Sequence, residues 1–412
     1  MLEQKNMFYP KYLQTLPNNF ADTKAGETLC KELPMLPKII ELVKSECTGA
    51  RTEHDAQIHI NELFGDGKYT IIKPKDKNGN ELEAKPLGVG SVAETWLVKD
   101  KDNKEYVVKM VKPGVSKTNL EKQKKDIESQ IKGTDEQANA NRKCLENLFN
   151  TWKKELDLKL ESEAAITLAN GVKHAHVVKP IETCQDGTAY VMEKAPGQLF
   201  SDYLAFEDLK SSMGIDNGSN VKRRTNIVSS YTNLYFEQIF SVPRKGEKVM
   251  HADPHPGNIF VSTDDKGQTI FTFIDTGNVI RMSNKEAVQN LYAHLNYFIG
   301  NTEGIATNLL KGAKYPEGID ENTAIKELKQ ELDTKFYNDH TYFEKGIENI
   351  FSLFNTVDTI AQNWMEKNKI ISNPDNTNMH KSEYTYLQNY EALEGTNIHN
   401  IIWNTLREKK EN

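Results

Sequence analysis

The fold is decided by the stretch HADPHPGN at residues 251–258, in which a histidine, an aspartate and an asparagine follow the pattern H-x-D-x-x-x-x-N. A phosphoryl-transfer site needs a carboxylate close to the acceptor hydroxyl and a nearby amide oxygen that holds a metal ion, and Asp253 and Asn258 have the required separation. Two prolines and a glycine within the stretch predict a stiff loop. An isolated HxD favours another reading, an Asx-rich loop that caps its own backbone, so the neighbouring residues must decide.

The segment after this loop favours the functional interpretation. Residues 258–261 and 269–274 are β-rich runs joined by a turn of Asp, Asp, Lys and Gly, which predicts a hairpin. Asp275 directly follows the second run, and a carboxylate beside Asn258 supplies the second hard oxygen ligand that Mg²⁺ favours. Alone, an aspartate before Thr-Gly is a turn residue; after this loop and hairpin, metal binding is the better interpretation.

A glycine loop lies upstream, where residues 85–94 read KPLGVGSVAE and offer Gly88, Gly90 and Ser91 as contacts for phosphates. Glycines let the backbone approach phosphates and point N–H groups at them. Dinucleotide-binding folds use a similar motif, but they require a helix straight after the loop. Residues 94–98 read as a strand instead, which favours a flap over nucleotide phosphates.

A lysine and three acids complete the candidate site. Lys109 lies among β-branched residues in the run 107–111, where a strand lysine that contacts the α- and β-phosphates is expected to pair with a helix glutamate. Glu161 is the best candidate for this partner, with Glu155 and Asp157 one to two turns earlier. Taken singly, the lysine would be an outward-facing strand residue and each acid part of a solvated helix face.

The order of these patterns predicts an α+β fold with a small strand-rich lobe and a larger helical lobe. We expect strands at 69–72, 95–98, 106–111, 177–181 and 189–193. We expect helices over about 120–168 with one break at 133–135, from the end of the last of these strands to about 240, and over 284–412. The corresponding domains are an N-terminal helical extension over 1–67, a nucleotide-binding lobe over 68–195, and a helical lobe over 196–412 that carries the catalytic loop and the metal-binding segment.

Composition limits the class of protein. The 412 residues are 37% hydrophobic with a net charge of −7, which is typical of a globular protein and too apolar for a disordered one. Basic residues are scattered among acids, which argues against a nucleic acid partner. The four cysteines lack metal-ligand spacing and indicate a reducing compartment. The sequence shows no signal peptide and no membrane-spanning window, so we expect a soluble, cytoplasmic protein; peripheral membrane contact and secretion without a signal peptide stay open.

Together these residues resemble the UbiB/AarF (ADCK-type) family of atypical protein-kinase-like proteins, also called ABC1 kinases. HADPHPGN is that family's own wording of the catalytic loop. Further segments resemble the family's lysine strand, its ExD motif and helix glutamate, its hinge and its metal-binding segment: KMVKPGV at 109–115, ELD at 155–157 with ESEA at 161–164, VME at 191–193, and DTGNV at 275–279.

The resemblance implies a bilobed protein-kinase-like fold that binds ATP and Mg²⁺ between its lobes. It implies that Asp253 is the catalytic aspartate, that Lys109 with Glu161 holds the phosphates, and that Asn258 and Asp275 bind Mg²⁺. Glu193 would be a hinge contact for the nucleotide, and Glu155 and Asp157 would face an N-terminal extension that covers the site. In the family that extension carries a K-x-G-Q motif, of which Lys11-Tyr12-Leu13-Gln14 is a degenerate version with Leu in place of Gly.

Three departures from the family pattern bear on function. The family's nucleotide loop is alanine-rich, but Gly88 and Gly90 restore the glycines of ordinary kinases. Thr276 replaces the usual phenylalanine of Asp-Phe-Gly, and the C-terminal segment reads as polar helices where many members have a membrane segment. The first departure favours phosphate binding, and the last weakens any direct transfer of the family's membrane-linked quinone role.

The sequence therefore predicts an ATP-dependent phosphotransferase or ATPase whose acceptor, whether a small molecule, a lipid, a protein or water, cannot be read from it. Two alternatives remain. The chain could be a nucleotide-binding pseudokinase that regulates a partner or lipid. It could also be a small-molecule phosphotransferase, a class of enzyme that uses the same HxDxxxxN pattern.

Overall fold

The structure is a computed structural model that describes residues 49–394 except 91, 130, 132, 134–141, 143–144, 147–148, 151–152, 206–217, 245 and 338–349. The described residues form two compact units. The N-terminal unit contains those of Leu2–Ile166 together with Val178–Lys194, and the C-terminal unit contains Thr167–Val177 together with those of Ala195–Asn412. Ser91, the degenerate motif at 11–14 and most of the predicted N-terminal extension lie outside the described residues.

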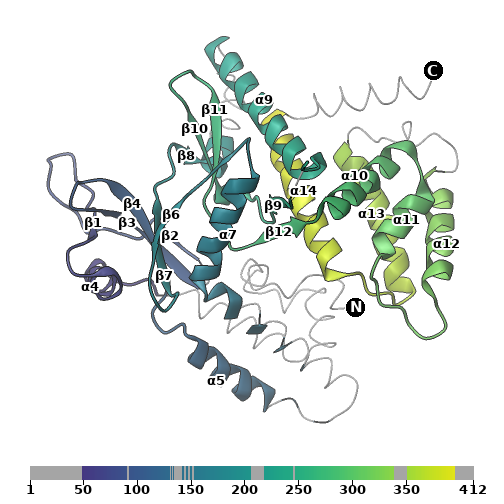
Figure 1. The fold of residues 1–412 in the computed structure, drawn as a ribbon, viewed down its shortest axis with the longest axis horizontal. Coiled ribbons are helices and arrows are strands. Elements are labelled where there is room, and N and C mark those ends of the chain that lie inside the picture. The colour runs from purple at the N-terminus through teal and green to yellow at the C-terminus, as the bar shows by residue number, and fades with distance from the viewer. Residues whose placement is uncertain are drawn as a thin grey trace. The chain divides into compact units, whose positions relative to one another are not determined.

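The N-terminal unit is built on a six-stranded antiparallel sheet (Figure 1). Its order is β1-β3-β4-β7-β6, with β2 paired to β3. The strands are β1 Thr70–Ile71, β2 Gly88–Val89, β3 Ala93–Lys99, β4 Glu105–Val111, β6 Pro180–Thr183 and β7 Ala189–Glu193. Asp100 shapes the β3–β4 turn by accepting hydrogen bonds from the N–H groups of Asp102 and Lys104, both at 2.9 Å, which is typical of an aspartate that mimics a backbone turn. The predicted meander is confirmed, with β7 at the expected residues.

One face of this sheet is covered by helix α4, Glu53–Phe64. Thr52 caps the helix by accepting from the N–H of Asp55 at 3.2 Å. Ala56, Ile60 and Phe64 recur on one face of α4 and are buried in the same hydrophobic cluster as the sheet side chains Tyr69, Ile71, Trp96, Val98, Tyr106, Val108, Met110, Ala189 and Val191. This part of the predicted N-terminal extension therefore belongs to the core of the sheet.

The helical region predicted over 120–168 has a break just before residue 158 that the sequence did not predict. Helix α5 spans Lys117–Glu128 and helix α7 spans Leu158–Gly171. The N–H of Leu158 donates to the carbonyl of Gly187 at 2.9 Å, in the turn before β7, instead of to a carbonyl one turn back. A tertiary hydrogen bond thus breaks the helix just before α7.

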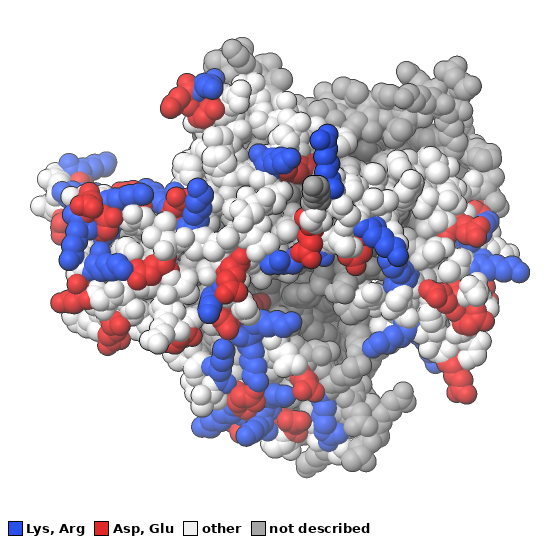
Figure 2. Space-filling view, in the orientation of Figure 1, with Lys and Arg blue, Asp and Glu red and all other residues white. Residues whose placement is uncertain are grey.

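Over α5, lysine side chains are mixed with acidic side chains on the face shown in Figure 2.

The C-terminal unit contains two small sheets. Four strands lie in the order β5-β11-β10-β8, namely β5 His176–Val177, β11 Thr269–Phe273, β10 Ile259–Thr263 and β8 Gln198–Leu199. The other pair is β12 Val279–Met282 with β9 Lys248–His251. The predicted hairpin is confirmed as β10–β11, but the strand predicted at 177–181 is wrong. It divides into β5 and β6, which belong to different sheets because the chain passes from one unit to the other between them.

Helices make up the rest of the C-terminal unit (Figure 1). They are α9 Gly218–Phe240, α10 Asn284–Ile299, α11 Thr302–Leu310, α12 Glu321–Leu332, α13 Ile350–Lys367 and α14 Pro374–Glu394. Helix α14 packs along α9, and α10 begins with a capping box formed by Ser283 and Glu286. Within the part of the chain that the structure describes, none of the helices combines the length and the apolar character needed to span a bilayer.

Candidate active site

In the N-terminal unit, Lys109 and Glu161 form a buried ion pair. The Nζ of Lys109, in the middle of β4, lies 2.6 Å from Oε1 of Glu161 on the first turn of α7, and the two side chains are 14% and 8% exposed. The hydroxyl of Tyr190 donates to the same Oε1 at 3.0 Å. The structure therefore brings together the lysine and glutamate that the sequence predicted as partners. It also shows a tyrosine that donates to the same glutamate oxygen.

Tyr190 is a site residue that the sequence interpretation missed. It lies directly opposite Lys109 in the antiparallel pairing of β4 with β7, and its side chain is almost fully buried. Cross-strand neighbours are close enough to interact, so correct pairing of the predicted strands at 106–111 and 189–193 would have indicated it. Two donors thus converge on one carboxylate oxygen and fix the orientation of Glu161.

The glycine loop is the hairpin that joins β2 to β3. Gly88 pairs with Thr95, and the N–H of Gly90 donates to the carbonyl of Ala93 at 2.8 Å, which closes a tight turn. A Cβ atom at Gly88 would lie 3.3 Å from Oγ1 of Thr95. A strand follows the loop, as predicted, and not the helix that a dinucleotide-binding turn requires. The role of the loop as a flap over phosphates stays a prediction, and Ser91 is outside the described residues.

The base of the glycine loop is anchored by a second buried ion pair. Glu94, in β3, is fully buried, and its carboxylate accepts from Nη1 of Arg51 at 2.8 Å and from the N–H of Arg51 at 2.9 Å. The same Nη1 also donates to the carbonyl of Val111 at 2.8 Å. Three hydrogen bonds therefore tie the chain just before α4 to the ends of β3 and β4.

In the C-terminal unit, HADPHPGN forms the end of β9 and the loop between β9 and β10. His251 is fully buried; its Nδ1 accepts from the N–H of Asp253 at 3.1 Å, and its Nε2 donates to the backbone carbonyl of Asp275. Pro256–Asn258 form a single 3₁₀ turn, in agreement with the stiff loop predicted from the prolines. The histidine of the motif thus links the predicted catalytic loop to the predicted metal-binding segment.

Asn258 and Asp275 lie at the same end of the β10–β11 hairpin. Ile259 pairs with Phe273, and the N–H of Ile274 donates to the carbonyl of Asn258 at 3.1 Å. The backbone of Asn258 is therefore bonded to the residue directly before Asp275, which places the two predicted metal ligands near each other. The Nδ2 of Asn258 donates to the carbonyl of Asp253 at 3.0 Å. Because the amide nitrogen is held in this way, a metal ion would be bound through the amide oxygen, which is the atom that Mg²⁺ requires.

The remaining predicted residues lie elsewhere in the N-terminal unit. Glu193 ends β7, and its N–H donates to the carbonyl of Lys179 at 3.0 Å, just before the chain leaves this unit. Asp157 precedes α7 and lies 3.6 Å from Nζ of Lys117, and Glu155 is half-buried before it. Their roles at a nucleotide stay predictions.

Residues 68–309, which include all of the site residues predicted from the sequence, match the ABC1 atypical kinase-like domain. The chain belongs to the ABC1 atypical kinase-like family. The kinase-like α+β fold that we expected from the resemblance is therefore confirmed, and so is the resemblance itself.

Curated members of the ABC1 family are similar over the same part of the chain. The "Probable protein kinase UbiB" of Aliivibrio fischeri is 27% identical over 238 residues, which cover 54% of this chain and 39% of that protein. The protein of the same name from Shewanella pealeana is 27% identical over 213 residues, 50% of this chain and 36% of its own. This chain thus matches less than two-fifths of the length of these relatives. Among solved structures, the complex of Rv3197 with erythromycin from Mycobacterium tuberculosis shares 16% identity at a TM-score of 0.42 and covers 80% of this chain and 73% of that one.

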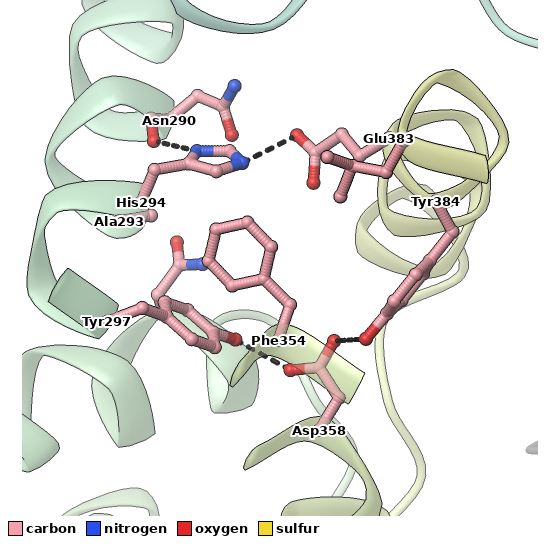
Figure 3. Close-up of a pocket in the computed structure, with 10 residues that line it drawn as sticks. Asn290, Ala293, His294, Tyr297, Phe354, Asp358, Glu383 and Tyr384 are labelled. Carbon is pink, nitrogen blue, oxygen red and sulfur yellow. Dashed lines mark hydrogen bonds and ion pairs between the residues drawn. The ribbon is translucent and has the colours of Figure 1, made fainter. Parts of the chain in front are cut away.

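A further polar centre of this ABC1 protein lies within its C-terminal unit, in a small cavity lined by side chains of α10, α13 and α14 (Figure 3). Its volume of about 20 Å³ fits one water molecule. The Nε2 of His294 lies 3.3 Å from Glu383, and Asp358 accepts from the hydroxyls of Tyr297 and Tyr384, both at 2.7 Å. Burial lowers the pKa of His294, but the charge and hydrogen bond of Glu383 outweigh it and raise that pKa. None of the residues predicted from the sequence lies in this cavity.

Proposed function

We propose that this ABC1 protein binds ATP with Mg²⁺ and transfers the terminal phosphoryl group to an acceptor or to water. The observation that carries the proposal is the ion pair between Lys109 and Glu161 at 2.6 Å. In protein kinases the corresponding pair must be formed before the lysine can hold the α- and β-phosphates. A chain that had lost phosphate binding would have no need to bury a lysine and a glutamate together, because removing both charges from water is costly.

The other residues take the roles that phosphoryl transfer demands. Asp253 would orient the attacking hydroxyl and accept its proton, and Asn258 and Asp275 would hold Mg²⁺ through an amide and a carboxylate oxygen. The ion would neutralise charge on the phosphates when bound. The protein's own contribution is mainly position: His251 fixes the backbone at Asp253 and Asp275, and Tyr190 fixes Glu161.

The two proposed ligands, Asn258 and Asp275, fit Mg²⁺ better than they fit a metal ion whose ligands all come from the protein. The described residues contain no group of three or more His, Cys, Asp or Glu side chains able to hold a metal ion. Mg²⁺ is usually bound through one or two protein oxygens, with phosphates and waters completing its six ligands, so Asn258 and Asp275 would suffice.

The test is Mg²⁺-dependent release of phosphate from ATP, measured for the wild type and for Asp253→Asn, together with ATP affinity measured by calorimetry. We expect wild-type turnover, a loss of about 100-fold or more in Asp253→Asn as for removal of a general base, and little change in its ATP affinity. A second variant, Lys109→Met, should lose ATP affinity. Equal turnover in the wild type and Asp253→Asn would reject the assignment.

A binding module without transfer gives a different result in the same experiments. ATP would then raise the melting temperature of the wild type by linkage, while no phosphate would be released with or without added acceptor. Release that increases with one class of acceptor, whether small alcohols, lipid vesicles or protein hydroxyls, identifies the substrate class.

A further inference from the structure

Three polar side chains of α14 lie on one helical face, and two of them contact the proposed catalytic loop. Ser382, Tyr386 and Asn389 are spaced by four and three residues, which places them on a single stripe of the helix. All three are buried, and Ser382 and Asn389 are 0% and 2% exposed. A stripe that faces a core is normally apolar, so buried polar side chains at these positions require specific partners.

The partners are backbone groups on both sides of the proposed catalytic aspartate. The hydroxyl of Ser382 donates to the carbonyl of His251 at 2.8 Å, and Nδ2 of Asn389 donates to the carbonyl of Pro254 at 2.7 Å. These contacts join residues that are 131 and 135 positions apart in the sequence. Asp253 lies between the two carbonyls that α14 holds.

Tyr386 completes the contact through α9. Its hydroxyl donates to Oε1 of Gln238 at 3.0 Å, and the same oxygen accepts from the N–H of His251 at 3.0 Å. Helix α14 is in turn fixed on α9, because the hydroxyl of Tyr231 donates to the carbonyl of Tyr386 at 3.2 Å. Both backbone polar groups of His251 are therefore held by side chains of α9 and α14.

The hydrogen bonds within the loop go to other carbonyls than those of His251 and Pro254. The carbonyl of Asp253 accepts from the N–H of His255 at 2.8 Å and from Asn258, and the carbonyl of His255 accepts from the N–H of Asn258 at 2.7 Å. The carbonyls of His251 and Pro254 accept from α14 instead. Since hydrogen bonds are directional and apolar packing is not, α14 restricts where the peptide units around Asp253 can lie.

We propose that α14 is part of the catalytic apparatus of this protein, and that Asn389 and Ser382 are positioning residues that hold Asp253 in place through the backbone of the loop. The helix lies outside residues 68–309, which match the ABC1 domain, so the family assignment does not include it. The proposal rests on the proposed function in so far as it concerns turnover. Its structural part, that α14 holds the loop, stands independently.

The experiment uses the full chain with three variants: Asn389→Leu, Ser382→Ala and the control Tyr384→Phe. The control lies on the same helix and loses a partly buried hydrogen bond, but that bond goes to Asp358 in the cavity and not to the loop. Hydrogen exchange of peptides that cover residues 250–260 is measured first, because it needs no activity. We expect faster exchange there in Asn389→Leu and Ser382→Ala, and wild-type exchange in the control.

Turnover of ATP is measured next. Because misplacement of a catalytic group by about 1 Å can cost about 100-fold, we expect kcat to fall by about 10- to 100-fold in Asn389→Leu, with KM for ATP within about threefold of wild type. Placed on Asp253→Asn, the same substitution should have little further effect, since it acts through that carboxylate.

The outcomes separate the two proposals. Faster exchange at 250–260 in the two loop-facing variants, together with a wild type that shows no turnover, would support the loop contact and refute the proposed function. Unchanged exchange and unchanged kcat in both loop-facing variants would overturn the role of α14, and so would equal changes in the Tyr384→Phe control, because the helix would then act only through general stability.

Discussion

The imidazole of His251 is hydrogen-bonded to the backbone at Asp275 and at Asp253. Its Nε2 donates to the carbonyl of Asp275, 24 residues later, and its Nδ1 accepts from the N–H of Asp253. These roles require the neutral ring with its hydrogen on Nε2. The ring also packs against Phe273, with ring centroids 4.6 Å apart. One buried side chain therefore sets the spacing between the backbone positions of the proposed catalytic aspartate and of the proposed metal ligand.

Replacing His251 by phenylalanine keeps a ring against Phe273 but removes both hydrogen bonds. Because the N–H of Asp253 and the carbonyl of Asp275 would lose their partner, we expect the free energy of unfolding to fall by about 1–3 kcal/mol. We also expect more Mg²⁺ to be needed for half-maximal turnover. Urea unfolding and a Mg²⁺ titration measure the two effects, with the exposed His174→Gln as a control; a variant as stable as wild type would contradict the role of this histidine.

Tyr190 should contribute to nucleotide binding through its hydrogen bond to Glu161. In Tyr190→Phe the carboxylate of Glu161 keeps Lys109 but loses the phenol, so the lysine is held less firmly. We expect ATP affinity, measured by calorimetry, to fall by a few-fold, less than in Lys109→Met, because the bond between Lys109 and Glu161 remains. On a Glu161→Gln background the tyrosine substitution should have a smaller effect, and an undiminished loss would place its action elsewhere.

Local patterns predicted the elements whose determinants are close in sequence. The strands containing Lys109 and Tyr190 and the hairpin before Asp275 follow from alternation and turn residues that lie within a few positions of each other. The proximity of Lys109 to Glu161 could also be anticipated, because a strand lysine that holds phosphates is expected to pair with a helix glutamate. The structure places these residues as the sequence led us to expect.

Features that depend on distant parts of the chain were not predicted. Strands β9 and β12 pair His251 with Val279. All four residues of β9 are buried, and in β12 only Met282 is, so neither strand shows the alternation that marks a half-exposed sheet. The helix break before Leu158 depends on a carbonyl at Gly187. The contact of Asn389 with Pro254 joins two regions that no local pattern connects. In each case a tertiary partner overrode the local preference.

The ion pair of Arg51 with Glu94 should matter more for stability than surface ion pairs do. Substitution Arg51→Met leaves a fully buried carboxylate without its cation, and we expect the free energy of unfolding to fall by about 3–5 kcal/mol. The double variant Arg51→Met with Glu94→Met removes both charges and should recover most of that loss. Urea unfolding of the three proteins tests this, with the exposed pair variant Lys194→Met as control. A double variant no more stable than Arg51→Met would show that the pair is not the source of the effect.

Lys248 should make the stability of the C-terminal unit depend on pH at the alkaline end. Burial lowers its pKa from 10.5 to about 8, against the opposing charges of Glu383 and Glu237, and its Nζ donates to the carbonyl of Ile239 at 2.8 Å. Below pH 8 the lysine is charged in both the folded and unfolded chain, so the folded state bears the full cost of burying the charge. Between about pH 8 and 10.5 only the unfolded chain keeps the proton, and this contribution to stability improves as pH rises.

Lys248→Met removes this cost and keeps an unbranched side chain in the same place. The shift corresponds to about 3 kcal/mol, so we expect the variant to exceed wild type by up to that amount below pH 8, and the difference to shrink toward zero near pH 10.5. The free energy of unfolding of both proteins, measured by urea at several pH values, isolates the lysine because other groups titrate alike in both. The exposed Lys266→Met is the control. A difference that is constant with pH would mean that Lys248 keeps an ordinary pKa, and that the helices around it admit enough water to solvate its charge.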